Sequence, residues 1–402
     1  MNWLGFIRLI NNIYGKGEID LGMIERQGLL AVKIGQVHAL RIDFLSEEKC
    51  SQLSKLYRNV SRIPPESFDN LLEEYGASDL LKKFSFFDRE PFASASVGQV
   101  HKARLSSGEN VAVKIIKKKN AESFLADVRT VSNLFKAVLF FYPKLKGVAN
   151  PVGLLDGIRK TTVAELDLRN EAEGHAVLEK IYLENRDKFD LSRLSFSCIY
   201  RDISSENIMV SDLIEAPSVD ELLEQGKFSY SDLLELFHIH GFFMFVIGIF
   251  HGDIHPGNVL YGGGKFYFLD TGYIGKVGTR IRKNLFFFFE SLSMYDYERC
   301  AFFLNEMADA RIEGRQYSDF ERKFLELYSD FRGKTVSEVS LTKQMMQTIK
   351  LGVVSGMEFE EGIFDIIKSL MYMDGMVRKA DPDAILLEDM RRFIGEFKSL
   401  MQ

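Results

Sequence analysis

The chain has 402 residues, of which 46% are hydrophobic and 27% are charged, and its formal net charge is −6. This length and composition predict a globular protein with a substantial core, built as one large bilobed domain or as two domains of ordinary size. The acidic balance argues against nucleic acid as a partner, because nucleic-acid binding depends on lysine and arginine contacts to phosphate.

Cysteine usage and the lack of a leader pattern predict the location. Cys50, Cys198 and Cys300 are scattered without metal-ligand spacing, which indicates free thiols in a reducing compartment. The N-terminus lacks the charged start and unbroken apolar core of a signal peptide. The most apolar stretch, residues 237–250, is shorter than the roughly 20 residues of a membrane span. We therefore expect a cytoplasmic protein.

The first residues of the chain leave peripheral contact with a membrane as an alternative. Apolar side chains recur there on one face of an expected helix: Trp3, Leu4, Phe6, Ile7, Ile10, Ile13 and Tyr14. Such a face suits a helix at a membrane interface or a helix packed on its own domain, and we favour the second interpretation.

The order of the predicted elements indicates an α+β class. Residues 1–85 have helical periodicity broken at Pro64-Pro65, residues 92–117 form strand, turn and strand, and residues 120–185 are again helical. A short strand pair near 194–214 precedes a mostly helical remainder, which strands interrupt at 251–275. This order predicts a bilobed protein-kinase-like fold with an N-terminal helical extension (1–85), a small β-rich lobe (86–215) and a large helical lobe (216–402).

The predicted hairpin at 92–117 has features of a nucleotide-binding lobe. In Val111-Ala-Val-Lys114, strand alternation places Val111 and Val113 on one face and Lys114 on the other, where an ammonium can neutralise the phosphates of ATP. The preceding alanine-rich loop would cover those phosphates with backbone N–H groups and be stiffer than a glycine-rich loop; it consists of Ala93, Ser94, Ala95, Ser96, Val97 and Gly98. Lys117, Lys118 and Lys119 are expected to form a solvated strand exit.

The most informative segment is the 251–258 loop, His-Gly-Asp-Ile-His-Pro-Gly-Asn. Phosphoryl transfer needs one carboxylate facing the attacking group, plus an amide oxygen and a second carboxylate that hold Mg²⁺ on the phosphates. Asp253, Asn258 and Asp270 supply this set, because a hairpin predicted at 259–269 would return Asp270 beside Asp253. We expect Gly262-Gly-Gly264 to form the hairpin turn, His251 to orient the loop and His255 to contact backbone.

A second segment, Tyr200-Arg-Asp202-Ile-Ser-Ser-Glu-Asn207, has the same aspartate-to-asparagine spacing. Strands predicted on both sides make it the tip of a hairpin, and Asp220, the next aspartate with suitable spacing, lies at an expected helix start. We therefore favour the 251–258 loop. The strand that follows this tip, at Asp212 and Ile214, is the expected hinge that reaches adenine by backbone hydrogen bonds.

An acidic run, Glu165-Leu-Asp167-Leu-Arg-Asn-Glu171, falls in an expected helix, where Asp167 and Glu171 would be neighbours one turn apart. One carboxylate can then face Lys114 while the others face elsewhere. A solvated acidic surface is an equally good interpretation of this run by itself.

Together these motifs resemble the UbiB-like atypical kinase family over residues 29–275. Lys33-Ile-Gly-Gln36 is similar to its K-x-G-Q signature, which continues through Arg41 and Asp43, and the alanine-rich loop, the Glu165-Leu-Asp167 motif and the 251–258 loop follow in the family's order. Leu269-Asp-Thr-Gly272 resembles the D-F-G segment, with Thr271 in place of the phenylalanine. The resemblance implies that Glu171 pairs with Lys114. It also implies that Lys33 and Gln36 lie near Glu165 and Asp167, where their helix would occlude a peptide groove.

The resemblance further implies ATP and Mg²⁺ as cofactors and a role in ubiquinone or related isoprenoid-lipid metabolism, beside lipid-modifying enzymes. The hypothesis is an ATPase or small-molecule kinase in which Lys114, Glu171 and Asp253 are catalytic and Asn258 and Asp270 bind the metal. Two alternatives are a protein Ser/Thr kinase and a non-catalytic, nucleotide-dependent scaffold.

Overall fold

The computed structural model describes residues 1–39, 45–57, 62–117, 121–141, 151–359 and 362–401. The chain folds into two compact units. The first contains Met1–Gly174 and Ser197–Glu215, and the second contains His175–Phe196 and Ala216–Gln402. The α+β class predicted from the sequence is confirmed, with a small antiparallel sheet in the first unit and mostly helices in the second.

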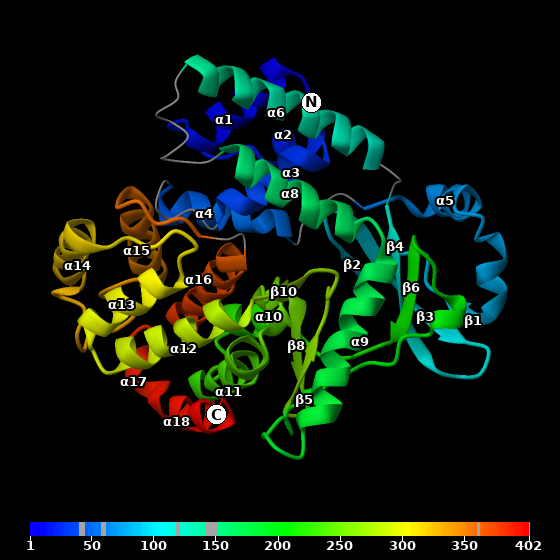
Figure 1. Cartoon of the computed structure of the whole chain (residues 1–402). Coiled ribbons are helices and arrows are strands. Elements are labelled where there is room, and N and C mark those ends of the chain that lie inside the picture. Colours follow the sequence, from blue (N-terminus) through cyan, green and yellow to red (C-terminus); the bar gives the residue numbers. More distant parts are fainter. Residues whose placement is uncertain (40–44, 58–61, 118–120, 142–150, 360–361, 402) are drawn as a thin grey trace. The chain divides into compact units, whose positions relative to one another are not determined.

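The first unit is helical at its start and again after its sheet (Figure 1). Its helices and 3-10 turns are α1 (Trp3–Tyr14), α2 (Leu21–Arg26), α3 (Leu29–His38), α4 (Glu47–Ser54), η1 (Lys55–Tyr57), η2 (Pro65–Ser67), α5 (Phe68–Glu74), η3 (Ser78–Lys83), α6 (Ala121–Phe141), α8 (Pro151–Glu165), α9 (Leu168–Asn185), whose later part belongs to the second unit, and η5 (Arg201–Ile203). Its strands are β1 (Phe84–Phe87), β2 (Ala93–Ser94), β3 (Gly98–Leu105), β4 (Asn110–Ile116) and β6 (Ile208–Asp212).

The strands of the first unit form one antiparallel sheet in the order β1-β3-β4-β6, with β2 paired to β3. The predicted β3–β4 hairpin is confirmed, and its turn includes Gly108, whose φ of 113° a residue with a side chain rarely adopts. One face of the sheet carries Val111, Val113 and Ile115 into a core shared with Phe68 of α5. The opposite face therefore remains for Lys114.

A separate core joins the N-terminal helices to α6 and α8. It includes Phe6, Leu9, Leu30, Phe124 and Ile158, all of them buried. The two cores do not follow the boundary predicted at residue 85. Helix α5, before that boundary, packs on the sheet, whereas α6 and α8, after it, pack on the N-terminal helices. The division itself remains a prediction.

The apolar face of helix α1 is only partly buried. Phe6, Leu9 and Ile13 are buried, which fits the favoured interpretation of a helix packed on its own domain. Four large hydrophobic side chains on the same helix are nevertheless exposed: Trp3 (56%), Leu4 (50%), Ile7 (41%) and Tyr14 (45%). The membrane interpretation therefore keeps a physical basis in this exposed stripe.

The second unit is mostly helical, with short strands near its start. Its helices and helical turns are α10 (Val219–Glu224), α11 (Tyr230–Gly241), η6 (Phe242–Ile247), η7 (Pro256–Asn258), α12 (Thr279–Ser293), α13 (Tyr297–Met307), α14 (Gly314–Tyr328), α15 (Leu341–Val354), α16 (Gly362–Ala380), α17 (Leu386–Asp389) and α18 (Arg391–Leu400). Its strands are β5 (Leu194–Ser195), β7 (Ile249–His251), β8 (Val259–Gly262), β9 (Lys265–Phe268) and β10 (Ile274–Lys276).

The predicted hairpin after the 251–258 loop is confirmed. Strands β8 and β9 pair antiparallel, and β5 pairs parallel with β9. Gly263 and Gly264 both have positive φ, at 58° and 75°, which is the turn geometry that a two-residue hairpin requires. The three glycines therefore turn a hairpin, as expected, and do not form a phosphate cradle.

The apolar stretch before the 251–258 loop is a buried helix, as predicted, up to Ile247. Helix α11 continues into the π-helix η6, and Gly248, with φ of 82°, ends the helix before β7 begins. Among the described residues, one helical window, Tyr230–Ile247, is long and apolar enough to cross a membrane, but 61% of it is buried. The core helix of a soluble protein has this character too.

Because of His240 in α11, we expect the stability of the fold to fall at acidic pH. His240 is fully buried, neither ring nitrogen has a hydrogen-bond partner in the described part of the chain, and burial lowers its pKa to about 3. The unfolded chain, with an ordinary pKa of about 6.5, takes up the proton first as the pH falls, so stability is lost below that pH. The loss from this residue should reach about 2 kcal/mol at pH 5.

We expect His240→Leu to flatten this pH dependence, because it removes the titrating group and keeps an apolar side chain of similar size. The measurement is the apparent melting temperature between pH 7.5 and pH 5 for both proteins. Melting curves that shift in parallel over this range would contradict the assignment. His251, which is also buried with a lowered pKa, should leave a residual slope in the variant.

Candidate functional site

In the first unit, Lys114 lies on the sheet face that the predicted alternation gives it. Val111 and Val113 are fully buried on the other face, whereas Lys114 is half-buried. Its Nζ donates to Oε2 of Glu171 at 2.6 Å, with side chains 18% and 9% exposed. The structure therefore brings together the lysine and the glutamate that the resemblance implies.

Packing by the start of α9 explains why Glu171 meets the sheet. Leu168 and Ala172, one helical turn apart, are buried against Ile116 and Met209 on the face that carries Lys114. Glu171 lies between them on the same side of the helix. A carboxylate this well buried needs its cation, since an unpaired charge there would lose hydration without compensation.

The alanine-rich loop is tied down by backbone and side-chain hydrogen bonds. Ala95 N donates to Gly98 O at 2.8 Å, and Lys117 N donates to Val97 O at 2.9 Å. Lys117 Nζ donates to Ala95 O at 2.6 Å. A Cβ at Gly98 would lie 3.1 Å from Ile115 O, so the close approach of β3 and β4 favours glycine here. These bonds favour the stiff cover that the residue types predict.

Lys117 is therefore not the solvated strand exit expected from the sequence. Its side chain is half-buried under the alanine-rich loop, and burial lowers its pKa to about 8. The sequence alone shows three consecutive lysines and gives no sign that the first one turns inward. Lys118 and Lys119 lie outside the described residues.

The K-x-G-Q segment forms most of helix α3, and only part of its expected contacts are present. Lys33 Nζ donates to Oε2 of Glu165, with both side chains mostly buried. Gln36 instead donates from Nε2 to Leu56 O at 2.9 Å and so holds α3 to η1. Arg41 and Asp43, from the same signature, lie outside the described residues.

The prediction that Asp167 and Glu171 lie one turn apart in a continuous helix is wrong. Helix α8 ends at Glu165 and α9 begins at Leu168, so Asp167 precedes α9 and its Oδ1 accepts from Arg169 N at 3.0 Å. Its carboxylate pairs with the Arg169 guanidinium at 2.6 Å, and that bond lowers the pKa of Asp167. Lys33 is therefore paired with Glu165 and not with Asp167. The occlusion of a peptide groove by α3 stays a prediction.

The expected hinge is only partly available for a nucleotide base. Asp212 N donates to Cys198 O at 3.0 Å, and the Asp212 carboxylate accepts from Cys198 N and from Tyr200 Oη. These contacts do not fit Asp212 as a residue that binds adenine through its N–H. No hydrogen bond joins the backbone of Ile214 to the rest of the described chain. Ile214 remains the predicted base-binding residue.

The competing Asp202–Asn207 segment is the bend of a hairpin, as expected. Tyr200 N donates to Val210 O at 2.8 Å, and Ile199 pairs with Ser211 as an isolated bridge. The first strand of the pair predicted near 194–214 is thereby reduced, before this bend, to a short pairing. Asp220 lies in the first turn of α10, whose N-cap is Ser218.

In the second unit, His251 holds the 251–258 loop in place. Its Nε2 donates to Leu269 O at 2.7 Å, and its Nδ1 accepts from Asp253 N at 3.0 Å. Only a neutral ring protonated at Nε2 satisfies both bonds. Burial lowers the pKa of His251, against the raising effect of the bond to Leu269 O. His255 Nδ1 accepts from Gly257 N, which is the backbone contact expected for it.

Close approach of two strands shapes the same loop. Strand β7, which leads into it, pairs antiparallel with β10, which follows Asp270. Gly252 N donates to Tyr273 O at 3.0 Å, and a Cβ at Gly252 would lie 2.4 Å from the Tyr273 ring. A side chain at residue 252 would therefore displace the segment after Asp270.

Asp253 has partners from inside and outside the loop. Its Oδ1 is 2.7 Å from Lys368 Nζ and accepts from Tyr372 Oη at 3.0 Å, both from α16. Its Oδ2 accepts from Asn258 Nδ2 at 3.3 Å. Burial alone would raise the pKa of Asp253, but the Lys368 ammonium outweighs it and holds this pKa below the usual range. Sequence reasoning missed both residues of α16, since no motif marks them.

Asn258 and Asp270, the residues expected to bind Mg²⁺, carry oxygen atoms of the kind that this ion prefers. Asn258 Nδ2 donates to Asp253 O at 3.0 Å as well as to Oδ2, which leaves the amide oxygen available as a ligand. Asp270 has φ of 54°, one of two positive values among the described non-glycine residues, a conformation that aspartate tolerates better than most residues. Oxygen ligands from one or two side chains suffice for Mg²⁺, which takes the rest from phosphates and water.

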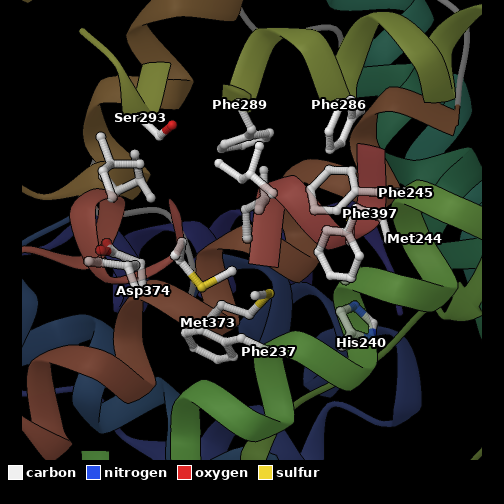
Figure 2. Close-up of a pocket in the computed structure, with 17 residues that line it drawn as sticks. Phe237, His240, Met244, Phe245, Phe286, Phe289, Ser293, Met373, Asp374 and Phe397 are labelled. Carbon is white, nitrogen blue, oxygen red and sulfur yellow. The ribbon is translucent and has the colours of Figure 1, made fainter. Parts of the chain in front are cut away.

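An apolar cavity lies elsewhere in the second unit, between α11, α12, α16 and α18 (Figure 2). Figure 2 shows the rings of Phe245, Phe286, Phe289 and Phe397 at its wall, with Asp374 on the side away from them. The lining contains no lysine or arginine for phosphate, so this cavity is not the nucleotide site.

The fold and these residues define a kinase-like protein. The sequence model of the ABC1 atypical kinase-like domain matches residues 55–304. The chain therefore belongs to the ABC1 atypical kinase-like family, in which the UbiB-like proteins are found, and the resemblance drawn from its motifs is confirmed.

Relatives agree with this assignment, and a solved structure shares the fold. The chain is 26% identical to the probable protein kinase UbiB of Pseudomonas aeruginosa, over 91% of this chain and 69% of that one. It is 28% identical to the chloroplastic protein ACTIVITY OF BC1 COMPLEX KINASE 8 of Arabidopsis thaliana, over 65% of this chain and 34% of that one. Rv3197 from Mycobacterium tuberculosis, solved in complex with erythromycin, has a TM-score of 0.57 at 18% identity, over 99% and 96% of the two chains.

Lys117 should be identifiable as an unusually reactive amine. With a pKa of about 8, roughly half of it is unprotonated at pH 8, against under about 1% of an ordinary lysine. We expect pulse acetylation across pH 6–10, read by mass spectrometry, to give a midpoint near pH 8 for Lys117. The exposed Lys102 is the internal control, and matching midpoints for the two lysines would contradict the burial of Lys117.

Proposed function

We propose that this protein binds ATP with Mg²⁺ and either hydrolyses it or transfers its γ-phosphoryl group to a small molecule, in support of isoprenoid quinone or related lipid biosynthesis. One observation carries the proposal. The loop with Asp253 and Asn258 is bonded through His251 and Asn258 to Leu269, the residue before Asp270. A carboxylate, an amide oxygen and a second carboxylate are thereby held on adjoining backbone, as phosphoryl transfer requires.

The chain's own residues would divide the work as follows. Lys114, held by Glu171, would contact the phosphates, and the alanine-rich loop would cover them with backbone N–H groups. Asp253 would orient the attacking water or hydroxyl and accept its proton. Asn258 and Asp270 would hold Mg²⁺, which when bound neutralises charge on the β- and γ-phosphates.

Two features support the lipid-related part of the proposal. The motifs resemble UbiB-type proteins, whose members act in ubiquinone or related isoprenoid-lipid metabolism. The exposed stripe of Trp3, Leu4, Ile7 and Tyr14 on α1 would suit peripheral contact with a membrane, where such substrates and lipid-modifying partner enzymes reside. A cytoplasmic protein that reaches the membrane surface is consistent with both.

The two alternative functions, a protein Ser/Thr kinase and a non-catalytic scaffold, predict different behaviour toward peptides and ATP. A protein Ser/Thr kinase would phosphorylate peptides in trans, and the predicted occlusion of the peptide groove by α3 argues against this. A non-catalytic scaffold would bind ATP tightly without turnover under any lipid condition. The retention of Asp253, Asn258 and Asp270 favours a catalytic protein over a scaffold.

Asp270→Asn should abolish ATP turnover. The purified protein is expected to hydrolyse ATP slowly with Mg²⁺, and faster with lipid or detergent present. Loss of one of the two metal-binding side chains should lower the rate at least about 100-fold, because the metal carries much of the transition-state charge. Phosphate release measures the rate.

The matched control is Asp319→Asn, which removes an exposed carboxylate of α14. It should turn over ATP like the unchanged protein. Equal turnover in the Asp270 and Asp319 variants would refute the assignment of Asp270.

The exposed stripe on α1 can be tested with vesicles. Trp3→Ser combined with Ile7→Ser should reduce co-sedimentation with liposomes of mixed zwitterionic and anionic lipids, since it removes apolar surface without touching the buried Phe6, Leu9 and Ile13. The melting temperature should change little. Undiminished liposome binding would assign membrane contact, if any occurs, to another surface.

A further inference from the structure

Helix α16 presents one face to the predicted catalytic segment of the second unit. Asp365, Lys368 and Tyr372 recur on that face at helical spacing. Both Asp365 carboxylate oxygens accept from Tyr273 Oη at 2.7 Å, so the helix is fixed to the segment after Asp270. The Tyr372 ring packs edge-on against His255, with centroids 5.3 Å apart. The whole face lies beyond residue 304, where the family match ends.

Lys368 brings a positive charge to a loop that has none of its own. The 251–258 loop contains no lysine or arginine. The Lys368 ammonium is 2.7 Å from Asp253 Oδ1 and 5.8 Å from the centre of the Tyr372 ring, which lies one turn further along the helix. The loop with the predicted catalytic carboxylate therefore takes its cation from a distant part of the sequence.

Geometry places this ammonium within reach of a transferred phosphoryl group. An attacking oxygen lies about 2.6–3.2 Å from the carboxylate that accepts its proton. The phosphorus lies about 3–3.5 Å further on in a reactive arrangement. A lysine at hydrogen-bond distance from that carboxylate needs only small rotations of its flexible stem to donate to both groups, since an ammonium has three donors.

Exposure of the carboxylate distinguishes this pair from a second ion pair on the same helix. The side chains of Lys368 and Asp253 are 31% and 21% exposed, so a ligand can approach both members of the pair. Lys379 instead pairs with Asp220 at 3.1 Å; the Lys379 side chain is 51% exposed, but that carboxylate is only 9% exposed. A ligand therefore reaches the carboxylate of the second pair less easily than that of the first.

We propose that Lys368 is a catalytic residue that contacts the γ-phosphoryl group during transfer, while Tyr372 keeps Asp253 oriented. This inference rests on the proposed function. In the step, a bond forms between the oxygen of water or an alcohol and the γ-phosphorus, and the bond from that phosphorus to the bridging oxygen breaks. The electron pair stays on ADP, the proton of the attacking group goes to Asp253, and Lys368 remains protonated and stabilises the phosphoryl oxygens.

The test compares Lys368→Met, Lys368→Arg and the control Lys379→Met. We expect Lys368→Met to lower kcat about 100-fold, the usual effect of removing one donor to transition-state charge, with KM for ATP within about threefold of the unchanged protein. Lys368→Arg keeps a positive charge and should recover at least about a tenth of the rate. Lys379→Met should lower the melting temperature while kcat is kept.

Other outcomes would overturn the proposal. If kcat in Lys368→Met equals that of Lys379→Met, Lys368 takes no part in the reaction. If Lys368→Met and Lys368→Arg lose rate, ATP-induced thermal stabilisation and melting temperature together, the role is structural. Turnover that depends on Asp270 but not on Lys368 refutes this inference alone, whereas no turnover in the unchanged protein refutes the proposed function as well.

Discussion

The candidate site in the second unit depends on the hydrogen bonding of one backbone residue, Leu269. Its carbonyl accepts from His251 and its N–H donates to Asn258 O, so both ends of the 251–258 loop are fixed to the residue before Asp270. A buried histidine is suited to this task only while it is neutral, and burial keeps it so. These two hydrogen bonds of Leu269 position the loop without using a side-chain oxygen of Asp253, Asn258 or Asp270.

In the first unit, ion pairs hold the predicted functional residues in place. Lys114 and Glu171 join a strand to a helix, and Lys33 and Glu165 join two helices. Each pair links segments more than fifty residues apart in sequence, and each is mostly buried, so one member without the other would be unfavourable. Arginine at Lys33 or Lys114 would keep the charge but not the compact shape, which explains why a lysine suits a mostly buried pairing position.

Local chemistry made much of this structure predictable. The β8–β9 hairpin follows from three consecutive glycines between apolar strands, and the face of Lys114 follows from alternation along β4. Predictions failed where a side chain's direction depends on distant residues. Asp167 caps a helix because α8 stops two residues earlier, and Lys117 turns inward because the alanine-rich loop offers a carbonyl. Neither event is visible in the residues next to it.

Helix α16 shows the same limit at the site itself. Its sequence has ordinary amphipathic periodicity, so Lys368 resembles any lysine at the edge of a helix. Only the fold brings Lys368 to Asp253, because α16 packs against α10, α11 and β10 with one face directed at that carboxylate. The family match, which ends at residue 304, covers the predicted metal-binding residues but not this cation. Residues inside and outside the family match therefore meet on the two oxygens of one carboxylate.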